Sequence, residues 1–418
     1  MPTISVIIPT YNAAPFLREA LDSLLAQTFT DWEAVCVNDG STDNSLEILQ
    51  EYAARDPRFR ILDGPNGGYG KAMNRGMDAA QGEYMAILEP DDILPPRAYE
   101  HLLAMARIDD LDIAKGAICI FHTDENGVKE CSYFPNTYLN RAVFAPIDNL
   151  NFFRCKPNTV SALYRMAYLR KNHVRYNETP GASYQDNGFF LISGAYARRV
   201  KMSGEIVYMY RQDNPNSSIN MPDSKMYLLI DEFKLAGEKL AECPEVWEKF
   251  KPAYVAKFVT NHIWMFGLIR ESRKLEFLRR IREEVFIPFE KEDWSVLMDW
   301  QREWLADVLQ SPEMALLKFS LRPELDNIAT RLAGNANCPQ TTSAGFGLFS
   351  KYNTPQKTVW KVLGIPVITR TRGNICTAVI DGAYVPLGHA DIYRVFGFRI
   401  RTRETLGYNL LHKDGVYY

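Results

Sequence analysis

Polar residues that can bind a nucleotide follow the first two apolar runs of the chain. The segments are Ile8-Pro9-Thr10-Tyr11-Asn12 and Asn38-Asp39-Gly40-Ser41-Thr42-Asp43. In an open parallel sheet, ligands bind in the crevice beyond the carboxyl ends of the strands, so both segments are expected to face one cleft. Asp39 is suited to accept a hydrogen bond from a base N–H. An Asx-turn or a helix cap explains Asp39 equally well on turn chemistry, and a cap is the favoured role for Asp43.

A glycine-rich segment, Asn66-Gly67-Gly68-Tyr69-Gly70-Lys71-Ala72-Met73-Asn74-Arg75-Gly76, precedes a helical pattern that ends near Gly82. Such a loop lets the backbone approach a phosphate at a helix amino terminus, and Lys71 or Arg75 can add positive charge. The spacing is neither that of a P-loop nor that of a dinucleotide-binding turn. A glycine-rich turn alone is weak evidence for a phosphate site.

Three carboxylates, Glu89, Asp91 and Asp92, follow the apolar run Tyr84–Leu88. Clustered carboxylates repel one another unless a cation offsets them. Oxygen ligands in a chain with only 6 His residues favour Mg²⁺ or Mn²⁺, held jointly by protein and substrate phosphates. For Asp92 alone, a helix cap ahead of Pro95 is an equally good interpretation.

The elements that must position these residues are strands alternating with helices. Up to about residue 120, short apolar runs alternate with stretches whose apolar residues lie three and four apart, which predicts βαβ units and a parallel sheet. The expected strands are Ile4–Ile8, Trp32–Val37, Phe59–Leu62 and Tyr84–Leu88. The turn Glu125-Asn126-Gly127 lies between Ile113–Phe121 and Val128–Tyr133 and predicts a hairpin, so the parallel pattern is expected to end there.

Length and composition limit the class of protein. At 418 residues, with 46% hydrophobic and 24% charged residues, the chain is expected to form two to three globular domains. A formal charge of −3 gives no overall field that would recruit nucleic acid or an anionic membrane. The amino terminus resembles no signal peptide, and no apolar run reaches the length of a membrane span. The 7 scattered cysteines make structural zinc and a disulfide framework unexpected, which favours a reducing cytosol.

Three further regions follow the first one. Residues 222–334 carry amphipathic stretches that predict a helical domain. Its five Trp residues are expected in the core and in helix packing rather than in a ligand platform; they are Trp247, Trp264, Trp294, Trp300 and Trp304. Residues 335–356 are rich in small polar residues, Gly and Pro, and predict a linker. Residues 357–418 contain a repeat with a period of 33 residues, because 361–370 aligns without gaps on 394–403. Each copy is expected to be a strand with a bulge or bend at its glycine, Gly364 or Gly397.

These motifs resemble glycosyltransferase family 2, whose members have the nucleotide-sugar-binding GT-A fold. The resemblance covers about residues 3–220, and the order and spacing of the motifs together are highly specific. The motifs are Ser5–Asn12, Val37–Asp43, Asn66–Gly76, Gly82–Asp92 and Ser183–Phe190. The resemblance implies an α/β fold with a Rossmann-like, mostly parallel sheet over 1–221, followed by the helical domain and the small β-rich tail.

The resemblance also implies roles for individual residues on the donor side. Base and ribose contacts fall on Pro9, Tyr11, Asn12 and Asp39, with Asn74 a further candidate nucleotide contact. The family's D-x-D element falls on Glu89-Pro90-Asp91, with Asp91 as the metal ligand. Glu89 stands where the family usually has Asp, and the ribose or the donor sugar is its expected partner.

The catalytic residues are implied in the same way. The family's base usually sits in a Glu-Asp pair, which here reads Gln185-Asp186, so the resemblance assigns the base to Asp186. Arg211 and Lys71 are candidates for the donor diphosphate, and Arg211 as an ordinary surface arginine is nearly as good an interpretation. The expected reaction is transfer of a sugar with inversion of configuration, because the resemblance implies a single base and no carboxylate that acts as a nucleophile.

The expected donor is a nucleotide-diphosphate sugar, with UDP favoured, and the expected cofactor is Mn²⁺ or Mg²⁺. The resemblance suggests a glycan or lipid-linked acceptor in bacterial surface polysaccharide synthesis, such as lipopolysaccharide or capsule. A cytoplasmic protein is expected. Its segment 357–418 holds nine basic and four acidic residues. This segment is expected to contact the membrane surface or a second subunit, and a β module that packs on the helical domain is an equally good interpretation. The alternatives are a nucleotide-sugar-binding protein with impaired catalysis and a sugar nucleotidyltransferase.

Overall fold

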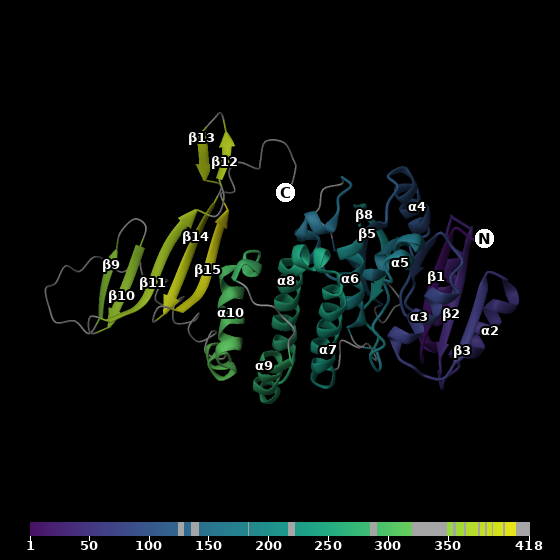
Figure 1. Cartoon of the computed structure of the whole chain (residues 1–418), viewed down its shortest axis with the longest axis horizontal. Helices are drawn as coiled ribbons and strands as arrows, with labels where there is room; N and C mark the ends of the chain where they lie inside the picture. Colours follow the sequence, from purple (N-terminus) through teal and green to yellow (C-terminus); the bar gives the residue numbers. More distant parts are fainter. Residues whose placement is uncertain are drawn as a thin grey trace. The chain divides into compact units, whose positions relative to one another are not determined.

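The computed structural model describes most of the chain and divides it into two compact units (Figure 1). The units are Met1–Leu305 and Ala306–Tyr418, and each is described by itself. The described residues are 1–123, 129–134, 142–182, 184–215, 222–284, 291–319 and the strands between 349 and 406.

The first unit is built on a sheet in which eight described strands take part, in the order β3-β2-β1-β4-β7-β5-β6 with β8 paired to β5. Pairing is parallel between β1 and β2, β2 and β3, β1 and β4, and β5 and β8; β7 and β6 run antiparallel to their partners. This mixed, mostly parallel sheet agrees with the predicted α/β class. The strands are β1 Ile4–Thr10, β2 Trp32–Asp39, β3 Phe59–Gly64, β4 Tyr84–Ile87, β5 Ile113–Thr123, β6 Lys129–Phe134, β7 Ala162–Arg165 and β8 Val200–Arg211.

Helices cover both faces of this sheet, because its central strands are apolar on both sides. Alternate residues of β2 point to opposite faces. Cys36 belongs to the core cluster shared with Leu17 and Leu21 of α1, whereas Val35 packs on the other face against Ala72 of α3. The helices of this part are α1 Ala14–Leu25, α2 Ser45–Arg55, α3 Tyr69–Ala79, α4 Ala98–Ile108, α5 Met166–Lys171 and α6 Gln185–Tyr196.

Along the chain, the run of strands in one direction ends where the sequence predicts. The predicted hairpin pairing of 113–121 with 128–133 is present as β5 and β6, and its turn lies outside the described residues. However, β7 already separates β4 from β5 and runs antiparallel to both. Because β7 is antiparallel to both, β4 and β5 run in the same direction, and β6 is the first described strand along the chain that runs against β1–β5. The expected end near residue 125 is therefore confirmed, whereas the position of β7 beside β4 was not predicted.

The helical region that follows β8 has the helices α7 Pro222–Ala241, α8 Pro244–Leu268, α9 Glu271–Glu284 and α10 Asp299–Gln310, with short 3₁₀ turns elsewhere in the unit. Aromatic packing holds α7 to α8, where Phe233 meets Tyr254 and Phe258 edge-on. Trp247 and Trp304 are buried as predicted. Trp264 is 41% exposed, so the predicted core position is wrong for this residue.

The described strands of the second unit form two small antiparallel sheets. They are β9 Phe349–Asn353, β10 Lys357–Val362, β11 Ile365–Asn374, β12 Thr377–Ile380, β13 Ala383–Pro386, β14 Gly388–Val395 and β15 Phe398–Leu406. Strand β9 lies within the predicted linker, where Phe349-Ser350-Lys351-Tyr352 alternates in polarity as a strand does.

Each copy of the repeat spans two paired strands, β10 with β11 and β14 with β15. The prediction of one bent strand per copy is wrong, because the chain pairs with itself across each glycine position; the glycines lie outside the described residues. Both pairings shift register at equivalent places, before Lys361 and before Arg394, 33 residues apart.

Two further expectations concern the whole chain. Among the described helices, none combines the length and the apolarity that crossing a bilayer requires. Of the cysteines, Cys36, Cys155 and Cys243 are free, whereas Cys119 on β5 is disulfide-bonded, which the scattered spacing did not predict.

Candidate active site

The loops after β1 and β2 hold each other through side chains of the first motif pair. The Asn12 carboxamide oxygen accepts a hydrogen bond from the Thr42 backbone N–H at 2.7 Å, and the Asn12 N–H donates to Ser41 Oγ at 3.1 Å. Asn12 adopts a left-handed φ of 50°, which asparagine tolerates better than most residues. Asp43 accepts from the backbone N–H groups of Ala14 and Ser45, both at 3.0 Å, so it pairs the first N–H group of α1 and of α2 from outside both helices, while Asn44 is the N-cap residue of α2.

Asp39 connects the end of β2 to the glycine-rich loop. Its two carboxylate oxygens accept hydrogen bonds from the N–H groups of Gly67 and Gly68, each at 2.9 Å. Gly68 has a φ of 88°, and a Cβ there would crowd the backbone of Gly181. Because glycine alone adopts this conformation without strain, the loop sequence and Asp39 together fix its path. A contact of Asp39 with a nucleobase stays a prediction.

The remaining predicted donor contacts differ in accessibility. Tyr11 is 52% exposed and Lys71, in the first turn of α3, is also exposed, whereas Pro9 is buried in β1. Asn74 is buried, and its amide bonds to the Tyr176 backbone N–H and carbonyl and to Glu178. In the structure Asn74 therefore positions residues 176–178, and its nucleotide contact stays a prediction.

The carboxylates after β4 have separate partners. The Tyr69 hydroxyl donates to Glu89 at 2.6 Å, and the Asn214 amide donates to Asp91 at 2.7 Å. Asp92 is buried and accepts from the Arg211 N–H at 2.8 Å, so it does not cap α4. Burial raises the pKa of Glu89 to about 8, and Asp91 and Asp186 contribute to that rise. Burial, reinforced by Asp91, also raises the pKa of Asp92 well above its usual range.

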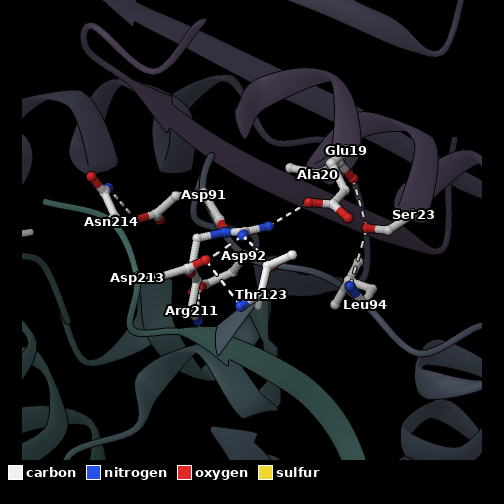
Figure 2. Close-up of polar contacts among 10 residues, drawn as sticks. All are labelled: Glu19, Ala20, Ser23, Asp91, Asp92, Leu94, Thr123, Arg211, Asp213 and Asn214. Atoms are coloured by element: carbon white, nitrogen blue, oxygen red, sulfur yellow. Dashed lines mark hydrogen bonds and ion pairs between the residues drawn. The ribbon is translucent and has the colours of Figure 1, made fainter. Parts of the chain in front are cut away.

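Arg211, at the end of β8, is at the centre of a buried polar cluster (Figure 2). Its guanidinium pairs with Glu19 and with Asp213, and its Nε–H donates to the Asp91 carbonyl at 2.7 Å. The rings of Phe16 and Phe121 lie 4.8 and 4.7 Å from the guanidinium carbon. With 4% of its surface exposed, Arg211 is not an ordinary surface arginine. Its predicted contact with a diphosphate would require release from these partners.

The residues present fit a divalent cation shared with a substrate, but not a closed protein site. In the part of the chain that the structure describes, no three His, Cys, Asp or Glu side chains converge as a metal site would require. Asp91 offers one half-buried carboxylate beside the Glu89 carboxylate. Mg²⁺ and Mn²⁺ commonly bind through one or two carboxylates plus substrate phosphates, which is the donor set that Asp91 can complete.

Asp186 lies in the first turn of α6 and is half-buried. The Asn187 amide donates to one Asp186 oxygen at 3.0 Å. Burial raises the pKa of Asp186 to about 6, and the Lys257 ammonium works in the opposite direction. Lys257, on α8, is buried, donates to the Cys155 carbonyl at 2.6 Å and has a pKa lowered by burial to about 8. The carboxylate is thus ionised near neutral pH yet has a higher proton affinity than an exposed aspartate.

Gln185, which stands where the family usually has Glu, has a structural task that a carboxylate cannot perform. It is 1% exposed, and its amide N–H₂ donates to Thr179 Oγ1 at 2.9 Å and to the Gly181 carbonyl at 3.1 Å. A carboxylate has no hydrogen to donate to these oxygens. The amide therefore fixes residues 179–181 beside the glycine-rich loop.

The structure places Asp91 and Asp186 close enough to Glu89 for both charges to raise the pKa of Glu89. It also adds residues that the sequence did not single out. Tyr69 lies within the glycine-rich motif, so its position was a usable signal. Lys257 and Asn261 lie in an apolar helical stretch about seventy residues from Asp186, and no local pattern marks them.

Comparisons with known proteins show what the chain is similar to. Residues 5–175 match the family model described as Glycosyl transferase family 2. The chain is 34% identical over 227 residues to the uncharacterized glycosyltransferase EpsJ of Bacillus subtilis, covering 53% of this chain and 64% of that protein. It is 47% identical over 112 residues to the uncharacterized glycosyltransferase YibD of Escherichia coli, covering 27% and 33%. The matches thus span less than two thirds of either relative.

The fold is also found among solved structures. The crystal structure of S. aureus TarS 1-349 in complex with UDP-GlcNAc superposes with a TM-score of 0.60 at 19% identity, covering 76% of this chain and 91% of that one. At this identity the likeness concerns the fold alone, and it supports the predicted GT-A class.

Proposed function

On the premise that residues 5–175 belong to glycosyltransferase family 2, we propose that the chain transfers a sugar from a nucleotide-diphosphate sugar to an acceptor hydroxyl with inversion. The observation that carries the proposal is Asp186, a half-buried carboxylate with a pKa of about 6 beside the Glu89–Asp91 segment. A base with such a pKa is mostly ionised at neutral pH and still takes a proton readily.

The donor lies, in this proposal, over the loops joined by Asp39. Pro9, Tyr11, Asn12 and Asp39 are the proposed contacts of the nucleoside, and Asn74 is proposed to act on the donor side through residues 176–178. The two Asp39 bonds hold the glycine-rich loop in one conformation, so little further ordering is needed on binding. UDP is the favoured nucleotide, which the UDP-GlcNAc complex of the similarly folded TarS supports as the first donor to try.

The diphosphate leaving group gathers negative charge as the glycosidic bond breaks. A bound Mn²⁺ or Mg²⁺ would stabilise that charge, and Asp91 is its proposed ligand. Lys71, exposed in the first turn of α3, is the better placed of the two proposed diphosphate cations, because Arg211 is already paired with two carboxylates. Glu89 is proposed to contact the ribose or donor sugar, with its orientation fixed by Tyr69.

On the acceptor side, Asp186 takes the proton of the attacking hydroxyl. Such general-base catalysis contributes about 10²–10⁴-fold to the rate. The Asn187 amide holds one Asp186 oxygen, which sets the orientation of the carboxylate. Glu89 is committed to the Tyr69 hydroxyl, so Asp186 is the carboxylate that remains for the acceptor, and a single displacement inverts the anomeric centre.

The proposed acceptor is a glycan or a lipid-linked saccharide of a bacterial surface polysaccharide, used by a cytoplasmic enzyme. Contact with the membrane surface, or with a second subunit, is proposed for the basic segment 357–418. Sedimentation of the full chain with anionic and with neutral vesicles distinguishes these outcomes. Binding to anionic vesicles alone supports membrane contact, and self-association without vesicle binding supports a second subunit.

Thermal shift with a panel of nucleotide sugars, with and without Mn²⁺, followed by measurement of free UDP, tests the proposed function. We expect stabilisation by a UDP-sugar and slow, metal-dependent UDP release. Stabilisation without any UDP release would instead indicate a binding protein, and release of pyrophosphate from a nucleoside triphosphate and a sugar phosphate would indicate a nucleotidyltransferase.

A further inference from the structure

One face of α8 lies along the beginning of α6. Lys257, Asn261 and Trp264 are spaced by four and three residues, so they fall on the same side of the helix. The positive charge of the Lys257 ammonium lowers the pKa of Asp186. The Asn261 amide donates a hydrogen bond to the Asn187 carboxamide oxygen. The Trp264 ring meets the Tyr184 ring edge-on, with centroids 6.2 Å apart. This face of α8 thus interacts electrostatically with Asp186 and contacts Asn187 and Tyr184, which lie within two residues of Asp186 in the sequence.

Trp264 differs in exposure from the tryptophans that are buried in the core. It is 41% exposed, whereas Trp32, Trp247 and Trp304 are at most 6% exposed. Leaving a large aromatic ring in water forgoes a substantial gain from burial. A single exposed ring is also far smaller than the ~1,000 Å² that a specific protein interface needs. Its size suits a small ligand better than a protein partner.

Tyr184 is unusual in two respects. Its backbone is left-handed, with φ 63° and ψ 10°, a conformation that costs a bulky residue about 1–3 kcal/mol. Its hydroxyl is buried and has no hydrogen-bond partner among the described residues. Glycine or asparagine would fill this turn at lower cost. The strained turn therefore places an aromatic ring directly before Gln185 and Asp186.

The loop that carries Tyr184 is fixed from three sides. Gln185 holds Thr179 and Gly181, the Tyr69 N–H donates to the Gly181 carbonyl at 2.9 Å, and Lys225 of α7 donates to the Ala182 carbonyl at 2.8 Å. These contacts join the glycine-rich loop on the donor side to the aromatic pair. A site so fixed binds a ligand with little loss of loop entropy.

We propose that Tyr184 and Trp264 form a platform on which a sugar ring of the acceptor packs, placing an acceptor hydroxyl at Asp186. The inference rests on the proposed function, since a general base must come within about 2.6–3.2 Å of the hydroxyl it deprotonates. Aromatic side chains with a few polar groups are the usual lining of sites for small ligands, and a sugar presents both an apolar ring face and hydroxyls.

Other groups that face Asp186 do not provide such a surface. They are Tyr69 of α3, Glu89 after β4, Tyr176 before α6, Glu232 of α7 and Lys257 of α8. Tyr176 and Glu232 are buried, and Tyr69 is committed to Glu89. The pair of Tyr184 and Trp264 is thus the aromatic surface that remains accessible beside the base among the described residues.

Saturation-transfer NMR on the full chain tests the platform with simple sugars in place of the whole acceptor. The probes are the methyl glycosides of glucose, galactose, N-acetylglucosamine and glucuronic acid, each titrated with and without UDP. We expect at least one probe to bind the wild type and Trp264→Ala to weaken it about tenfold, which is the upper range of an aromatic contact. Trp264→Phe should retain part of the affinity, and Tyr184→Phe, which keeps the ring and removes only a buried hydroxyl, should retain most of it.

Ile108→Ala, an 81% exposed apolar residue of α4, is the matched control and should change nothing. UDP affinity, measured in parallel, should be the same in all variants. Absence of binding by every probe, or equal binding by the wild type and Trp264→Ala, would overturn the platform. Failure of the wild type to bind UDP would instead count against the proposed function, so the two failures are distinguishable.

Discussion

The donor side and the base side of the site are assembled in different ways. On the donor side, Asn12 and Asp39 bond to loop residues that belong to the family motifs. On the base side, Asn177, Ala182 and Asn187 are held by Lys225 and Glu232 of α7 and by Asn261 of α8. The first side is specified by short segments of sequence, whereas the second depends on helices that follow the family segment.

This difference separates what the helical region does from what the sheet does. The sheet supplies strand ends at which nucleotide-binding loops can form without help from distant residues. The start of α6 depends on α8 instead. The Lys257 charge lowers the pKa of Asp186, and the Asn187 amide that bonds Asp186 accepts a hydrogen bond from Asn261 of α8. The helical region thus contributes residues to the candidate site and is not only a neighbour of it.

Removing the base tests the base side most severely. Asp186→Asn should lower sugar transfer by about 10²–10⁴-fold, because the amide cannot accept the acceptor's proton. UDP binding, measured by calorimetry, should stay near the wild-type value, since the donor contacts lie on the other side. Turnover close to that of the wild type would remove Asp186 from the role of base.

Asp39→Asn tests the donor side alone. One of the two N–H groups of Gly67 and Gly68 would then face an amide N–H₂, and the loss of a charge-assisted bond costs about 1.5–3 kcal/mol. UDP affinity should fall by about 10- to 100-fold while the pH dependence of turnover stays unchanged. Asp148→Asn, at an exposed position of a 3₁₀ turn, is the control. An unaltered UDP affinity would show that the loop does not depend on Asp39.

Gln185→Glu tests whether restoring the family's usual residue helps or harms this chain. The carboxylate would lose the bonds to Thr179 and Gly181 and would bury a charge beside their oxygens. We expect the free energy of unfolding to fall by about 1–3 kcal/mol, measured by denaturant titration. Gln212→Glu, at an exposed position, should leave it unchanged. A more stable and more active Gln185→Glu variant would contradict the structural role of the amide.

Lys257→Met should produce the smallest effect, a shift in the pH profile. Transfer requires ionised Asp186, so the rate falls as the pH drops through its pKa of about 6. Without the Lys257 cation that pKa rises, and the fall should begin at a higher pH, by about one unit. Lys257→Arg should restore the wild-type profile, and Lys249→Met, exposed on the same helix, should not alter it. An unchanged pH–rate profile in Lys257→Met would show that the Lys257 charge on α8 does not affect Asp186.

The sequence predicted the donor side well for a physical reason. Runs such as Ile4–Ile8 and Trp32–Val37 are buried on both faces. Their continuous apolar sequence therefore predicts a strand without knowledge of the neighbouring strands. Glycines with a required backbone conformation, such as Gly68, mark the loops that follow. The role of Asp43 at a helix start was predictable for the same reason, since both of its partners lie near the strand ends.

The base side was predictable only in part. The motif indicated Asp186 and includes Asn187, but it gave no sign of Lys257 and Asn261 on α8, because a buried lysine in an apolar helix resembles a surface lysine in sequence. Arg211 behaves in the same way, since its burial between two phenylalanine rings depends on α1, β5 and β8 meeting in space. The insertion of β7 beside β4 likewise depends on residues far along the chain.

The anomeric configuration of the first product tests the central claim most directly. Proton NMR of the full chain with UDP-GlcNAc, recorded as UDP is released, distinguishes the two configurations of the new sugar by the coupling of the anomeric proton. A single displacement assisted by Asp186 predicts that the α-configured donor gives a β-configured product. An α-configured first product would contradict the account, because it would require a second nucleophile that the site does not supply.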